Sequence, residues 1–123
     1  MAAPNLLSPT TITGKTVTVN LTTTSATSVL SNAASSGKTL KINSLYVANT
    51  TATAANITIN QYSAAALGGT AFPIASTIAV PGNATLVVID KDAYVYLEEN
   101  MRLGATAGTS SALQIVCSYE DIS

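Results

Sequence analysis

The sequence predicts an all-β fold, a single antiparallel β-sandwich of jelly-roll type. Polar and apolar residues alternate over short segments rich in Val, Ile and Thr, as in strands that bury one face. Clusters of Gly, Pro, Asn, Ser and Thr separate these segments at short intervals. No helical rhythm alternates with the strands, which argues against parallel βαβ units and favours a sandwich.

The expected strands are located by this alternation. Val17, Val19 and Leu21 share one face of the first segment. A slight offset of the pattern occurs between Ile42 and Leu45. The predicted strands are Thr16–Leu21, Thr39–Asn49, Asn56–Tyr62, Pro73–Val80, Thr85–Asp90, Tyr94–Leu97, Arg102–Ala107 and Leu113–Glu120.

Two connecting segments have more specific expectations. Pro81 and Gly82 suit a tight turn, with proline fixing φ and glycine taking the left-handed position. The segment 25–37 allows a single helical turn, because Val29 and Ala33 lie four residues apart. Its many serines and threonines are weak helix formers, so no longer helix is expected.

The composition favours a subunit that is completed by its neighbours. A chain of 123 residues supports one domain, and 47% of them are hydrophobic, but many of these are alanines. Only 9% are charged, which leaves broad neutral surfaces. We expect an extended arm over residues 1–14 and a sandwich domain over 15–123. Leu6 and Leu7 are the large apolar groups of the arm, so they are candidate subunit contacts.

Several classes of function are disfavoured. The net charge is −1 without a basic run, which predicts no nucleic-acid partner. No run of about eighteen apolar residues or Sec signal is visible, so we expect no membrane partner and synthesis in a cytoplasm. The chain lacks histidine, which removes the Ser-His and Cys-His nucleophile systems. Cys117, the one cysteine, lies in an apolar run and is expected to be buried.

Two sequence patterns suggest ligand chemistry but do not fit it. Gly-Lys-Thr occurs around Lys15 and Lys38, but each copy lacks the first P-loop glycine and precedes a strand rather than a helix. These lysines are expected to face water beside turns. The acidic cluster of Asp90, Asp92 and the Glu98-Glu99 pair matches no calcium loop. We therefore predict no catalytic residue, no metal and no cofactor.

The segments "PGNATLVVIDKD" (81–92), "YLEENMRL" (96–103) and "SYEDI" (118–122) form a pattern that resembles small virion structural proteins of tailed bacteriophages, especially marine and cyanobacterial phages. The family's "P-x-x-[AS]-T-L-V-V-I-x-K-D" strand corresponds to 81–92, its "YLEEGD-SLR" turn to 96–103 and its "SYEEI" strand to 118–122. The segment "KINSLYVANTTATAANITI" also matches the family's pattern. Asn100-Met101 replaces the family's Gly-Asp, and asparagine tolerates the left-handed turn conformation.

The resemblance implies a non-enzymatic virion subunit, most simply a capsid decoration (cement) protein. Its partners would be itself, as a homotrimer, and other virion proteins such as the major capsid protein. The alternative is a tail or neck fibre or spike component, with or without binding of a host-surface carbohydrate. Tyr94 and Tyr96 lie two residues apart, so they share one strand face and are candidate contacts for a subunit or a sugar.

Overall fold

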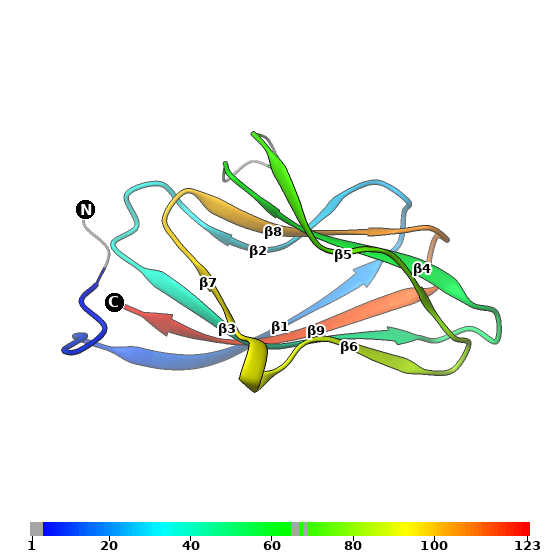
Figure 1. The fold of residues 1–123 in the computed structure, drawn as a ribbon, viewed down its shortest axis with the longest axis horizontal. Helices are drawn as coiled ribbons and strands as arrows, with labels where there is room; N and C mark the ends of the chain where they lie inside the picture. Colours follow the sequence, from blue (N-terminus) through cyan, green and yellow to red (C-terminus); the bar gives the residue numbers. More distant parts are fainter. Residues whose placement is uncertain (1–3, 65–66, 68) are drawn as a thin grey trace.

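The computed structural model describes residues 4–64, 67 and 69–123, and it confirms the all-β antiparallel sandwich. Two sheets face each other, and the start of β1 and the end of β9 lie at the same end of the molecule (Figure 1). The elements are β1 (Ile12–Leu21), β2 (Thr27–Asn32), β3 (Thr39–Asn49), β4 (Ala55–Tyr62), β5 (Ala71–Val80), β6 (Thr85–Ile89), the 3-10 turn η1 (Lys91–Ala93), β7 (Val95–Leu97), β8 (Met101–Ala107) and β9 (Leu113–Ile122).

The chain crosses repeatedly between the two sheets, although β4 and β5 follow one another in one sheet and β6 and β7 in the other. In the described residues, sheet A has the order β1-β9-β3-β6 with β7 also paired to β3, and sheet B has the order β2-β8-β4-β5. Contacts between β1 and β2 form one rim of the sandwich, and contacts between β5 and β6 form the other. The strands β1 and β5 are therefore sheet edges on opposite rims.

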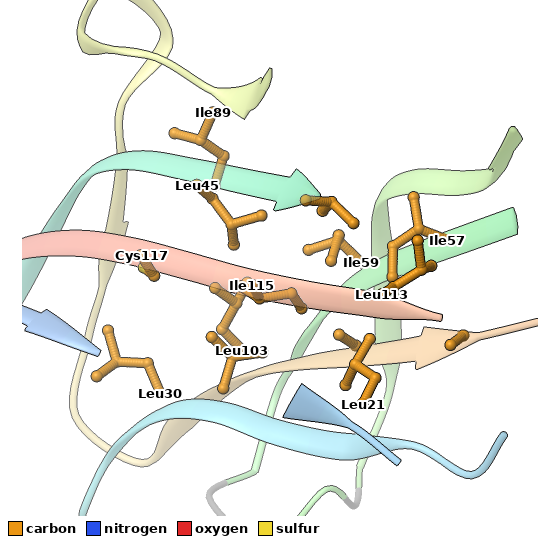
Figure 2. Close-up of a cluster of buried hydrophobic side chains, with 14 of the residues drawn as sticks. Leu21, Leu30, Leu45, Ile57, Ile59, Ile89, Leu103, Leu113, Ile115 and Cys117 are labelled. Carbon is orange, nitrogen blue, oxygen red and sulfur yellow. The ribbon is translucent and has the colours of Figure 1, made fainter. Parts of the chain in front are cut away.

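The core lies between the sheets and is built from medium-sized aliphatic side chains (Figure 2). The inward residues alternate with outward ones, as the sequence predicts for most strands. In β3 the pairing with β9 shifts register between Ile42 and Ser44, and this bulge explains the offset in the sequence pattern. The largest fully buried side chains are Leu21, Ile42, Leu45, Val47, Ile57, Ile59, Val80, Ile89, Leu97, Leu103, Leu113 and Ile115.

The expected helical turn between residues 25 and 37 is wrong, because this segment contains β2. Its pairing with β8 shifts register between Ser28 and Leu30. Val29 and Leu30 are consequently both buried, although they are consecutive. A bulge of this kind hides the alternation by which strands are recognised.

The edges of two predicted elements also need correction. β1 begins at Ile12 rather than Thr16, so residues 12–14 of the expected arm belong to the sheet. β9 continues to Ile122, and Ile12 pairs with Ile122. Each strand is longer than predicted because the other strand supplies hydrogen-bond partners for its backbone. The sequence of a single strand does not show such partners.

The turn at Pro81 forms, but its left-handed residue is Asn83 (φ 57°) rather than Gly82. The Ala84 amide donates to the Pro81 carbonyl at 3.2 Å. Gly82 is needed for close packing, since a Cβ there would lie 2.2 Å from the carbonyl oxygen of Ala52. Asn100 does adopt the left-handed conformation, with a φ of 61°.

Candidate functional site

The charged groups that the sequence singled out have structural roles or lie apart. The Asp90 carboxylate caps η1, accepting hydrogen bonds from the amides of Asp92 and Ala93 at 3.0 Å each. Within the described ranges, no three His, Cys, Asp or Glu side chains are grouped so that they could hold a metal ion. A membrane-crossing helix, long and apolar, is likewise not found in those ranges.

The sequence predicts that Lys15 and Lys38 face water beside turns, but in the structure both bind a carboxylate. Their side chains are about half exposed, but both ammonium groups contact the same Asp121 carboxylate oxygen, at 3.1 and 3.2 Å. Burial alone would raise the pKa of Asp121, but hydrogen bonds from the two lysines outweigh it and lower that pKa. The hydrogen bond to Asp121 raises the pKa of Lys15. The two Gly-Lys-Thr tripeptides therefore join β1 and the β2–β3 loop to β9.

Cys117 is buried, as the sequence predicts. Its side chain has no exposed surface, and burial raises the pKa of its thiol to about 11. A thiol of this kind is protonated at neutral pH and unreactive. The folded subunit thus offers no accessible thiol from its one cysteine.

The surfaces available for contact with another molecule carry exposed apolar side chains rather than charged groups. The first set is in the arm, where Leu7 is 95% exposed and Leu6 about half exposed. A turn presents both leucines, because the Leu7 amide donates to Asn5 Oδ1 and the Ser8 amide donates to the Asn5 carbonyl. The structure thus leaves the arm's leucines available for contact, and the contact itself remains a prediction.

The second set lies on β5, the edge strand of sheet B. Phe72 is 57% exposed, and Ile74 and Ile78 are also exposed. Thr77 has a left-handed φ of 52° where the pairing with β4 shifts register. This irregularity splits the edge into two short segments, which is a common way to limit unwanted strand pairing.

The third set lies on the outer face of sheet A. Val116, Tyr46 and Val87 form a continuous row, since register pairs Tyr46 with Val116 on one side and Val87 on the other. This row was missed in the sequence. One feature of the sequence could have indicated this row: Val116, between the inward residues Ile115 and Cys117, is apolar where the alternation predicts a polar residue.

The predicted pair Tyr94 and Tyr96 lies at the end of this same face. The two rings contact edge to face, with centroids 5.4 Å apart. The Lys41 ammonium lies 4.5 Å from the centre of the Tyr94 ring and 3.9 Å from a Glu120 oxygen. Both tyrosines remain partly exposed, so they are available to a partner.

Comparisons with known proteins find a shared fold but no family. Neither a protein-family model nor a curated protein matches the sequence. Among solved structures, the chain is similar to a subunit of Bacillus endospore appendages, a family of disulfide-linked pili. The TM-score is 0.53 at 18% sequence identity, over 92% of this chain and 88% of that chain. The two proteins share a fold.

These comparisons overturn the expected bacteriophage virion protein. The residues that carried that resemblance form β3 and β4, the Pro81 turn with β6 and η1, the Asn100 turn between β7 and β8, and the end of β9. Such strand and turn patterns recur in unrelated sandwiches, because they specify a fold and not a site. Three predictions are therefore wrong: the capsid-decoration function, the major-capsid-protein partner and the virion location.

Proposed function

We propose that this chain is a non-enzymatic structural subunit that polymerises with copies of itself into an external fibre. The similarity to a pilus subunit supports this proposal, because it covers nearly the whole of both chains. The fold alone does not specify function, so the surface must supply the rest of the argument. Of the two roles expected from the sequence, capsid decoration and fibre component, this similarity favours the fibre component.

The observation that carries the proposal is the pair of unlike sheet edges on opposite rims. β1 pairs with β9 over its whole length without a register shift, and in the described part of the chain its other edge has no strand partner. Its one charged side chain, Lys15, is already bound to Asp121. A long regular edge with little protection is prone to pair with another strand.

The opposite rim carries an exposed apolar surface. Phe72 and Ile74 on β5 are exposed at a sheet edge, where a solitary subunit gains nothing from them. Contact between the β1 rim of one copy and the β5 rim of the next joins two different surfaces. Such heterologous contacts repeat into open filaments when their rotation does not close, so a closed homotrimer is not required.

The arm provides a further proposed contact between copies. Leu6 and Leu7 would bury apolar surface on a neighbour, and the prolines at 4 and 9 limit the freedom that the arm loses on docking. The linkage cannot involve a disulfide from the folded subunit, because Cys117 is buried. The similar pili are disulfide-linked, whereas we propose that copies of this chain are joined by non-covalent contacts.

A charge on the β5 edge tests the proposed polymer. Ile74→Lys removes an apolar contact and places a cation in the interface, so it should raise the critical concentration for fibre formation at least about tenfold. Ser110→Lys, on an exposed loop at one end of the sandwich, is the matched control and should assemble normally. Sedimentation and electron microscopy give the readout. Equal assembly of both variants would remove β5 from the interface.

A further inference from the structure

The outer face of sheet A is built from cross-strand rows that run from β1 through β9 and β3 to β6 or β7. Register gives each row its members and their order. In the central row, Val116, Tyr46 and Val87 are all exposed. The rows are Asn20–Gln114–Ala48–Thr85, Thr18–Val116–Tyr46–Val87, Thr16–Ser118–Ser44 and Gly14–Glu120–Lys41–Tyr96.

The two halves of this face differ in shape. The β3 side carries bulky exposed groups, Tyr46 and Val87 in one row and Tyr96 in another. The β1 side carries smaller side chains and has a hollow of about 330 Å³, lined by residues 18–20 and 114–116. A Cβ on Gly14 would meet nothing within 4 Å, so this end of the β1 side is also open. One half therefore protrudes where the other recedes.

We propose that two copies of the chain pack face to face through this surface, about a two-fold axis parallel to the strands and between β9 and β3. The axis places β3 of one copy over β9 of the other, and the β6 and β7 side over β1. Tyr46 then lies over Val116 beside the hollow, and Tyr96 lies over the open space at Gly14. By symmetry each of these contacts occurs twice: Tyr46 meets the apolar Val116, and Tyr96 meets the open space at Gly14.

The polar groups support the same axis. Glu120 of one copy faces Lys41 of the other, so two opposite-charge pairs form. A parallel axis placed over β9 would instead oppose two Glu120 side chains, and one over β3 would oppose two Lys41 side chains. Asn20 faces Thr85, an amide against a hydroxyl, and Ser118 faces Ser44. The remaining positions of these rows carry no charge. A second copy is therefore the occupant whose shape and charge the face matches.

This contact goes beyond the proposed fibre, because it leaves the β1 and β5 rims free. A four-strand face is small beside a stable interface of about 800 Å² per partner, so isolated subunits should pair weakly. Along a fibre the same contact repeats many times and gains avidity. The face then joins fibres side by side.

Thiol cross-linking tests the axis in the full-length chain. Asn20→Cys and Thr85→Cys are made as separate single variants and mixed, then treated with a bis-maleimide matched to the roughly 10 Å between packed sheets. The axis brings residue 20 of one copy opposite residue 85 of the other. It keeps two copies of the same residue about 14 Å further apart laterally, three strand spacings. Buried Cys117 makes the unaltered chain a blank.

The expected result is a cross-linked dimer in the mixture, at least about tenfold above either variant alone. No dimer in the mixture, or equal dimer in the single-variant samples, would overturn the proposal. The proposed rim contact would also bring β1 of one copy near β6 of the next, so the mixture is repeated with Ile74→Lys, which blocks the β5 rim. A dimer that persists there comes from the face contact, and a dimer that is lost there would overturn this proposal. A persistent dimer without visible fibres in the Ile74 background would contradict the proposed polymer alone, so the two failures are distinguishable.

A second pair of variants tests the shape match. Gly14→Phe fits its own subunit, where the Cβ position is open, but collides with the partner's Tyr96. It should lower the cross-link yield at least about tenfold in the Cys background, whereas Gly14→Ala should leave it unchanged. Circular dichroism verifies that both variants fold. An unchanged yield with Gly14→Phe would place Tyr96 elsewhere and refute the axis.

Discussion

At the scale of single residues, two buried asparagines join the two sheets. Asn49, at the end of β3, donates to the carbonyls of Thr53 at 2.8 Å and Val80 at 3.0 Å. Asn32, at the end of β2, donates in the same way to Lys38 and Leu97 at 2.9 and 3.0 Å. Each asparagine bonds to a strand of the opposite sheet. They stabilise the sandwich because the bonds to Val80 and Leu97 are buried, while those to Thr53 and Lys38 are partly buried.

We predict that Asn49→Ala destabilises the fold by about 1–3 kcal/mol, the cost of one unsatisfied buried polar group. The substitution removes the donor to the buried Val80 carbonyl, whereas the Thr53 carbonyl keeps its bond from the Thr51 hydroxyl at 3.0 Å. Urea unfolding followed by circular dichroism measures the change. Asn56→Ala, on an exposed side chain of β4, should change the unfolding free energy by less than about 0.5 kcal/mol. Similar losses in both variants would contradict the proposed role of Asn49.

The ion cluster at Asp121 predicts a dependence of stability on pH. The pKa of Asp121 is lowered in the folded state, so its ionised form stabilises the fold at pH above the ordinary carboxyl pKa. That contribution is lost as pH falls through the folded-state pKa. Asp121→Asn should therefore be less stable than the natural chain at pH 7, and the difference should shrink by pH 3.

Urea unfolding at the two pH values measures this effect. Asp92→Asn, on an exposed residue of η1, is the control and should show no comparable change. A stability difference for Asp121→Asn that is the same at pH 7 and pH 3 would mean that the carboxylate charge is unimportant.

At the scale of elements, the period-two alternation was enough to locate β3, β4, β6 and β9 closely. It failed at β2, where a bulge buries two consecutive residues. The lysine contacts with Asp121 were beyond sequence reasoning, because they join residues 106 and 83 positions apart. Local patterns thus determine the strands, whereas the polar clusters depend on which strands become neighbours.

The candidate contacts were predictable only in part. Leu6, Leu7, Tyr94 and Tyr96 were chosen for size and position, and all four are accessible. The edge of β5 and the outer face of sheet A were not chosen, because exposure depends on strand order.

Deleting residues 1–9 should separate folding from assembly. The deletion retains the amides of Thr10 and Thr11, which donate to the Ser123 carbonyl at 2.7 and 3.0 Å. The sandwich should therefore keep its melting temperature. Burial of Leu6 and Leu7 on a neighbour would contribute about 3–5 kcal/mol before the cost of ordering the arm, so assembly should weaken at least about tenfold.

Sedimentation of the truncated and full chains compares their assembly. The double variant Leu6→Ser with Leu7→Ser keeps the arm's length and should show the same loss. If both variants assemble as tightly as the full chain, the arm makes no subunit contact.

At the scale of the whole molecule, the fold separates a buried aliphatic core from three exposed apolar surfaces. These surfaces are the arm, the β5 edge and the outer face of sheet A. With a net charge of −1 and few charged residues, little electrostatic repulsion keeps copies apart. A subunit of this kind gains stability from its neighbours by mass action.

The central claim is that the full chain polymerises into fibres without disulfides. Electron microscopy of the purified protein over a range of concentrations, with and without a strong reductant, tests it most directly. We predict long fibres of uniform width in both conditions, because Cys117 is buried and takes no part in assembly. A protein that stays monomeric or forms only small closed rings at every concentration would contradict the proposed polymer. Fibres that dissolve in reductant would contradict the non-covalent linkage.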